Sequence, residues 1–196
     1  MSRQGHIVDI ASLPENFPTH RHDPQFWEEL GRTVATFGFL EETLGKAIFA
    51  FSATTEYNED AVSEALERWQ KQLEKALSDP LGGKIAAYER AVKAHGGLEM
   101  SNFEELIADL RAAGQVRNAL CHGSWRPPNS QGASRAHFVD RDQRRFTSLV
   151  DKNFLKQTRK HVTELYATVV STVTCMGWQF PGSDGPGEPI WRSRKE

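Results

Sequence analysis

The sequence of 196 residues contains little cysteine, methionine or tyrosine and carries almost no net charge. Its two cysteines, Cys121 and Cys175, lie within helical patterns and lack the spacing of metal ligands, so we expect reduced thiols in the core. A formal net charge of −2 provides no general attraction to nucleic acid or to a membrane surface. A local basic site remains open, because phosphate binding depends on where the charges lie.

The sequence also lacks an apolar run long enough to span a membrane. Residues 1–16 do not show the basic and then apolar layout of a signal peptide. We therefore expect a cytoplasmic protein without membrane contact.

Helical patterns fill most of the chain. Residues 1–22 are expected to be an irregular lead-in, 23–178 a single helical domain, and 179–196, rich in glycine, proline and charge, a disordered tail. Apolar residues recur every three or four positions in five segments between these boundaries. The predicted helix starts are Asp23-Pro24, Asn58, Lys84, the capping box Ser101 to Glu104, and Asp151.

Two short apolar runs before the last helix, 136–139 and 145–150, flank the polar residues 140–143. This pattern predicts a β-hairpin. The expected fold class is all-α: an antiparallel bundle of four or five helices, with a small β-hairpin inserted before the last helix.

Two charged residues interrupt the apolar stripes. Glu41 continues the series of apolar positions in the first long helix, and Arg117 continues the series in the fourth. A slightly rotated helix could bring Glu41 to solvent at the rim of the core, but charges on core-facing positions persist mainly when they are paired. We therefore predict that Glu41 and Arg117 lie close to each other as an ion pair.

Arg117 also begins a polar cluster, Arg117-Asn118-Ala119-Leu120-Cys121-His122, which ends at Gly123. Asn118 and His122 share a helix face, whereas Arg117 and His122 lie about 140° apart around the axis. One helix therefore cannot direct both Arg117 and His122 at one small target unless it frays at Gly123. Two copies of the motif at a two-fold interface can, which favours a homodimer.

This cluster resembles the R-x4-6-H motif of HEPN domains, including the asparagine that follows the arginine. Glu41 is similar to an acidic residue in the first long helix of that family. The resemblance covers roughly residues 24–178 and is specific mainly over the six-residue motif. Ser124 departs from the tyrosine that some toxin members carry two positions after the histidine, which puts silencing by modification of that tyrosine in doubt.

The resemblance implies a helical homodimer that cuts RNA without a metal or cofactor, in toxin–antitoxin or other defence systems, with an antitoxin or regulatory protein as a possible partner. It implies that Arg117 binds the scissile phosphate and that His122 acts as general base or acid. Asn118 would orient His122 or the phosphate, and Glu41 would hold Arg117. We also expect RNA contacts from residues just downstream of the motif: Trp125, Arg126, Arg144 and Arg145.

Two alternatives remain at this point. Arg117 and His122 can be structural, with His122 bonded to a carbonyl at the helix end, in an inactive module that binds RNA, nucleotides or protein. For the downstream residues, core packing of Trp125 and a solvated basic surface compete with RNA binding. A hydrolase using Cys121 and His122 is excluded, because adjacent helical residues point about 100° apart.

Overall fold

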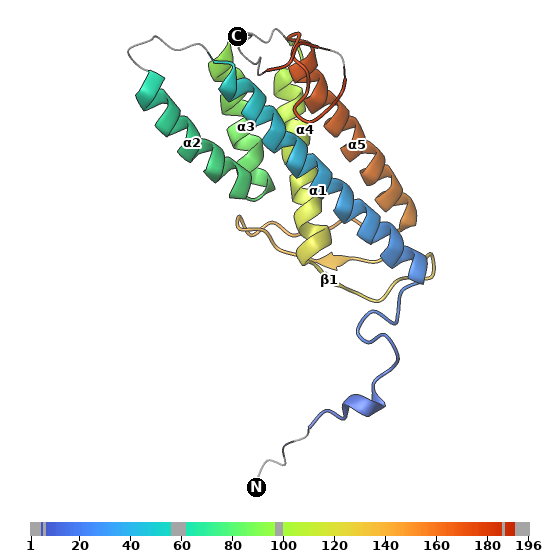
Figure 1. Ribbon diagram of the computed structural model, residues 1–196. Coiled ribbons are helices and arrows are strands. Elements are labelled where there is room, and N and C mark those ends of the chain that lie inside the picture. Colours follow the sequence, from blue (N-terminus) through green and yellow to red (C-terminus); the bar gives the residue numbers. More distant parts are fainter. Residues whose placement is uncertain (1–4, 6, 56–61, 97–99, 186, 191–196) are drawn as a thin grey trace.

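The structure is a computed structural model that describes residues 5, 7–55, 62–96, 100–185 and 187–190. These residues form five α-helices and one small antiparallel sheet, so the protein is mostly helical (Figure 1). The sheet lies between the fourth and fifth helices in the chain. The elements are α1 (Pro24–Ala53), α2 (Val62–Ser78), α3 (Leu81–His95), α4 (Phe103–His122), β1 (Ser124–Trp125), β2 (Ala136–His137) and α5 (Lys152–Thr174).

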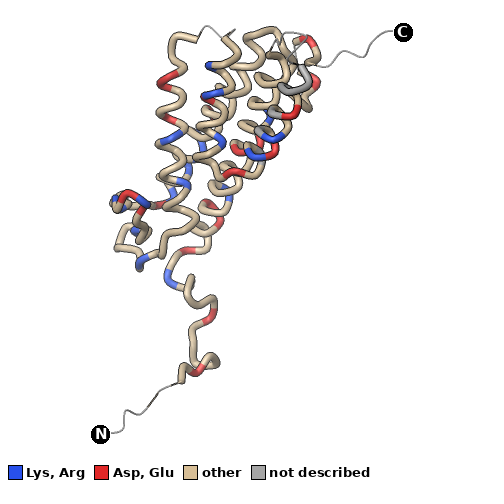
Figure 2. Tube along the Cα trace, turned by 90° about the vertical axis from the view of Figure 1, so that its left-hand side faces the viewer, with Lys and Arg blue, Asp and Glu red and all other residues tan. Residues whose placement is uncertain are grey.

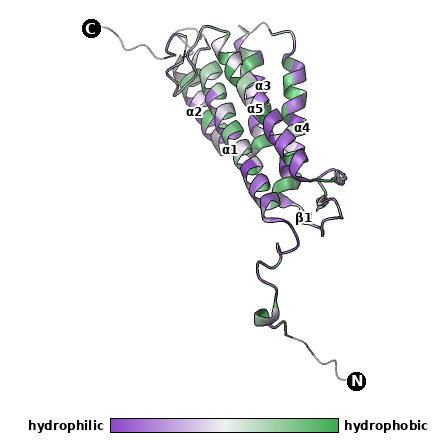
Figure 3. Cartoon of the chain, turned by 90° about the vertical axis from the view of Figure 1, so that its right-hand side faces the viewer, coloured by the Kyte–Doolittle hydropathy of each residue, from purple (hydrophilic) through white to green (hydrophobic). Residues whose placement is uncertain are grey.

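Helix α1 is the axis of the core and packs against each of the other four helices. Its start is as predicted: Asp23 accepts a hydrogen bond from the backbone N–H of Gln25, and Pro24 occupies the first turn. Its inner face buries large apolar side chains, each of which contributes roughly 1.5–3 kcal/mol when removed from water. Figure 3 shows hydrophobic residues along the inner faces of the helices. The buried side chains of α1 include Phe26, Phe37, Leu40, Leu44 and Phe51.

The prediction for the final helix is also confirmed, since Asp151 accepts a hydrogen bond from the backbone N–H of Phe154 at 2.7 Å. The predicted cap of α2, Asn58, lies outside the described residues. Within the described residues, no helix combines the length and apolar character needed to cross a bilayer.

Two predicted helix starts are wrong. Helix α3 begins at Leu81, three residues before Lys84, because Gly82 and Gly83 belong to its first turn. Gly83 is needed there, since a Cβ at this position would lie 2.9 Å from the Cβ of Asp79.

Helix α4 begins at Phe103 and is preceded by Asn102, so the predicted capping box does not form. Glu104 pairs with Lys93 at 2.8 Å instead of reaching back to Ser101. Lys93 of the neighbouring helix α3 therefore binds the carboxylate of Glu104, which the sequence pattern predicted to cap α4.

The predicted β-hairpin is only partly present. Strand β2 pairs with β1, in the register Ser124 with His137 and Trp125 with Ala136. Residues 145–150 form only isolated bridges, at Arg145 and Val150. The pairing differs because β2 is packed against the end of α4, which makes β1 its neighbour.

Both ends of the chain continue beyond the helices. The described part of the lead-in is irregular except for a short 3-10 helix, Ile10–Ser12, and its first part runs away from the helices (Figure 1). Its last residue, His22, is buried against Phe26 of α1. The sequence predicts a disordered tail from residue 179, yet the chain folds back after α5. Trp178 bridges to Glu188, and Phe180 is buried, because this aromatic side chain finds space on the core.

Candidate functional site

The motif occupies the last turns of α4, and Gly123 ends the helix. The backbone N–H of Gly123 donates to the carbonyl of Ala119 at 2.9 Å. A Cβ at Gly123 would clash first with the carbonyl oxygen of Ala119 in α4 and would also lie 2.7 Å from the Cβ of Ala136 in β2. Glycine is therefore required here both by the last turn of α4 and by the close approach of β2.

Arg117 points from α4 toward α1, where its Nη2 lies 3.2 Å from Oε1 of Glu41. The two side chains are 25% and 23% exposed, so the ion pair is partly desolvated. The predicted pairing of Glu41 with Arg117 is confirmed. This contact fixes the direction of the guanidinium while leaving part of it open to solvent.

Asn118 is exposed, and its side-chain oxygen accepts a hydrogen bond from Nη1 of Arg117 at 3.3 Å. The amide thus contacts the arginine side of the motif, and its position favours orienting Arg117 over orienting His122. Arg117 is consequently held from two directions, by Glu41 and by its sequence neighbour.

His122 is exposed at the last position of α4. Its ring makes no hydrogen bond or ion pair with any residue that the structure describes. The structural alternative required a buried imidazole bonded to a carbonyl at the helix end, and this arrangement is not found. The imidazole is therefore accessible to a ligand and to solvent protons.

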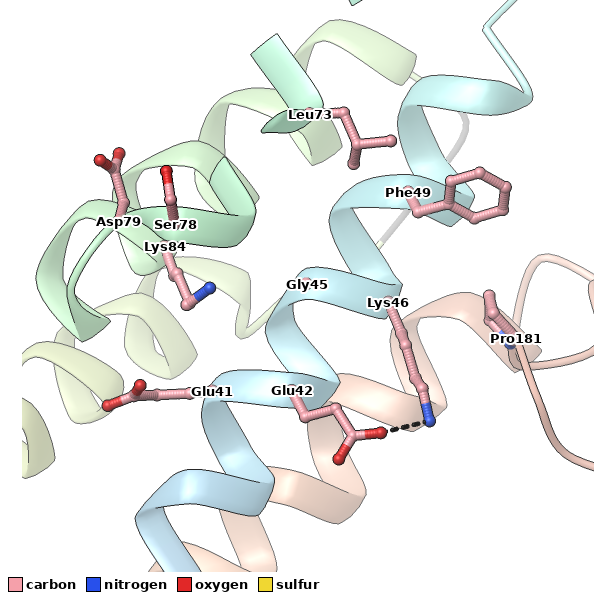
Figure 4. A pocket seen from close by; sticks show the side chains of 10 residues that line it. All are labelled: Glu41, Glu42, Gly45, Lys46, Phe49, Leu73, Ser78, Asp79, Lys84 and Pro181. Atoms are coloured by element: carbon pink, nitrogen blue, oxygen red, sulfur yellow. Dashed lines mark ion pairs between the residues drawn. The ribbon is translucent and has the colours of Figure 1, made fainter. Parts of the chain in front are cut away.

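A cavity of about 620 Å³ adjoins the ion pair, because Glu41 also lines it. Figure 4 shows it bounded by α1 and by the turn between α2 and α3. Lys84 reaches into this region from α3; its side chain is buried and donates to the carbonyl of Ala76 at 3.1 Å. Glu42, on the same helix as Glu41, pairs with Lys46 at 2.7 Å. Phe49 and Leu73 supply apolar lining.

Trp125 has a packing role that the sequence left open. Its ring is half-buried and meets Phe26 edge-on, with ring centroids 5.0 Å apart. Trp27 and His22 complete this aromatic cluster around it. These contacts support the packing alternative, in which Trp125 attaches β1 to the start of α1.

The three predicted RNA-binding arginines differ in their surroundings. All three are exposed, but Arg144 is bound within its own turn, to Asp140 at 2.8 Å and Asp142 at 2.6 Å. The backbone N–H and the guanidinium of Arg144 lower the pKa of the Asp140 carboxyl. Arg126 and Arg145 make no side-chain ion pair with a described residue. Figure 2 shows acidic and basic residues close together in the loop between β1 and α5.

Both cysteines are free and exposed, so the expectation that they are core thiols is wrong. Each lies beside a buried apolar stripe at a helix end, where the pattern does not fix exposure. Desolvation still raises the pKa of Cys121, with a smaller lowering effect from Arg117 and a raising effect from Glu41. A thiol held in its neutral form next to His122 provides no activated nucleophile.

His137, an exposed residue of β2 that lies directly opposite Ser124, is not among the residues predicted from the sequence. It was missed because its strand was predicted to pair with residues 145–150. The alternation of buried Ala136 and exposed His137 was the available signal.

Within the described residues, no group of three or more histidine, cysteine or carboxylate side chains comes together as a metal site. The chain matches no protein-family model, no curated protein and no solved structure with which it was compared.

Proposed function

We propose that this protein is an endoribonuclease of the HEPN type that acts as a homodimer and needs no metal. The proposal rests on one observation, which is that the motif holds its arginine in place and leaves its histidine open to solvent. Arg117 is fixed by Glu41 at 3.2 Å, while His122 at the helix end is exposed and has no partner among the described residues. RNA cleavage of this kind requires a positioned cation that binds the phosphate and an accessible imidazole that transfers a proton.

The chemistry is an internal transesterification. The 2′-hydroxyl of the RNA attacks the adjacent phosphorus, the P–O5′ bond breaks, and the products carry a 2′,3′-cyclic phosphate and a 5′-hydroxyl. Arg117 neutralises the charge that develops on the phosphate oxygens. His122 takes or gives one of the two protons that move, since imidazole titrates near neutral pH. The nucleophile belongs to the RNA, so no metal-bound water is needed.

The proposal includes a second copy of the chain. Arg117 and His122 lie about 140° apart on α4, and Arg117 is directed at α1, so one copy does not direct both groups at one phosphate. The face of α1 next to Glu41 carries Gly31 and Gly38, both exposed. A Cβ at either glycine would meet no described atom within 4 Å. Packing within one chain therefore does not require glycine at either position, and this open face would allow a second copy to approach closely.

The wider features of the proposal follow from this site. The fold would be an antiparallel helical bundle, supported by the contacts of α1 with all four other helices. Exposed Arg126 and Arg145 would contact the RNA backbone beyond the scissile phosphate. The biological setting would be a cytoplasmic toxin–antitoxin or defence system, in which a second protein restrains the nuclease.

The test is incubation of the wild type, Arg117→Ala and His122→Ala with end-labelled RNA in EDTA. All three proteins are first compared by circular dichroism and by size. Cleavage by the wild type alone, with 2′,3′-cyclic phosphate ends, supports the proposal. The absence of cleavage by the wild type on several RNAs contradicts it.

A second candidate function, a nucleotide-binding regulatory module, is favoured by the cavity of about 620 Å³ beside Glu41. Its volume lies in the range of ligand sites, and it combines apolar lining with the buried cation of Lys84. Under this candidate, mononucleotides change the NMR signals of residues such as Gly45 and Leu73, and the protein does not cut RNA. If mononucleotides at millimolar concentration cause no change, this candidate is excluded.

A further inference from the structure

The outer face of the small sheet presents a second histidine close to the motif. In the β1–β2 ladder, Trp125 lies opposite Ala136, and both face the core. Trp125 is half-buried and Ala136 is buried. Ser124 and His137 are opposite each other on the other face and are exposed. Directly opposed residues in an antiparallel pair have Cβ atoms about 4.5–5.5 Å apart. His137 therefore lies beside Ser124.

Ser124 is separated from His122 only by Gly123, whose φ of −73° and ψ of 141° are those of a polyproline II residue. The Cα atoms of His122 and Ser124 therefore lie no more than about 7 Å apart. His122 and His137 thus flank the same short segment, and the contact of Gly123 with Ala136 keeps β2 against it. His137, like His122, makes no side-chain hydrogen bond or ion pair within the described part of the chain.

We propose that His137 is a second catalytic residue, which works with His122 as a general base and general acid pair. This inference rests on the proposed ribonuclease function. His137 takes the proton of the 2′-hydroxyl as its oxygen forms a bond to phosphorus. His122 gives a proton to O5′ as the P–O5′ bond breaks. Exchange of protons with water then returns both rings to their starting states.

The assignment of the two roles is part of the proposal. His122 lies at the carbonyl end of α4, and His137 lies in a ladder that also contains the exposed cations Arg126 and Arg135. The other charged groups near the motif are Arg117 and Glu41, which form an ion pair.

The test compares His122→Gln, His137→Gln and the control His161→Gln, an exposed histidine on α5, on two substrates. One is an RNA dinucleotide; the other is a nucleoside 3′-(4-nitrophenyl phosphate), whose nitrophenolate leaves without a proton. On the dinucleotide, each site variant should lose about 10²–10⁴-fold in rate. On the nitrophenyl ester, His122→Gln should recover most of its rate, and His137→Gln should remain slow.

Several results decide the inference. It is overturned if wild type cleaves RNA and His137→Gln cleaves within twofold of His161→Gln. In that case the proposed function stands without it. Failure of the wild type on both substrates removes the proposed function and this role together. If His137→Gln does not fold, the wild-type pH–rate profile decides: a general base and a general acid together predict a bell-shaped profile, whereas a single limb contradicts the pair.

Discussion

At the scale of single residues, the contact between Glu41 and Arg117 connects the two helices that carry the site. Both side chains are about three-quarters buried, so each charge is partly desolvated and relies on the other. Positioning is the contribution expected of Glu41, since it holds the guanidinium and has no proton to transfer in the proposed reaction.

The pair should be measurable as a coupling free energy. Glu41→Gln and Arg117→Met are each expected to lower the free energy of unfolding by about 1 kcal/mol, between the values for exposed and fully buried pairs. The double variant should be less destabilised than the sum of the two single variants. Urea unfolding of the four proteins measures this. Strict additivity would mean that the ion pair contributes nothing to stability.

A second prediction at this scale concerns His22, which is buried among Phe26, Trp27 and Trp125. Its Nε2 has no partner in the described structure, and burial lowers its pKa from the ordinary value of 6.5. As the pH falls through 6.5, the unfolded chain takes up a proton that the folded chain does not yet bind. The contribution of His22 to stability is therefore complete above this pH and decreases below it.

Urea unfolding of wild type at about pH 7.5 and about pH 5.5 should show lower stability at the lower pH. His22→Phe should reduce this difference, whereas the control His161→Gln should not. An equal pH dependence in wild type and His22→Phe would show that protonation of His22 does not contribute.

At the scale of secondary structure elements, Gly123 at the end of α4 and Gly38 in α1 have opposite requirements. Gly123→Ala places a Cβ against the carbonyl oxygen of Ala119 and 2.7 Å from the Cβ of Ala136, and it should cost about 1–3 kcal/mol in unfolding free energy because the end of α4 and β2 must move apart. Gly38→Ala meets no described atom within 4 Å and should raise the stability of a single chain by up to about 1 kcal/mol. Denaturant curves at low protein concentration compare the two, and equal effects would contradict the close packing around Gly123.

The helices were predictable because their signals are local. Asp23-Pro24 and Asp151 act as caps in the structure, and the apolar period determines the buried face of α1. The hairpin was not predictable in the same way, because both 124–125 and 145–150 are possible partners for residues 136–137. The contact of Gly123 with Ala136 decides between them, and this contact is tertiary.

At the scale of the whole molecule, the sequence predicted the part of the site that depends on charge in an apolar stripe, namely Glu41 with Arg117. It did not predict the packing of Trp125 or the salt bridges of Arg144, because these depend on segments distant in sequence or on the geometry of a turn. His137 was missed for the same reason as the hairpin. The proposed arrangement of two copies also lies beyond a single chain.

The measurement that tests the central claim most directly is a mixture of two inactive variants, Arg117→Ala and His122→Ala, after exchange of subunits. If each site takes Arg117 from one copy and His122 from the other, a mixed dimer has one intact site. An equimolar mixture should then recover about one quarter of the wild-type RNA cleavage. No recovery, with an active wild type and demonstrated exchange, would contradict a site shared between two copies.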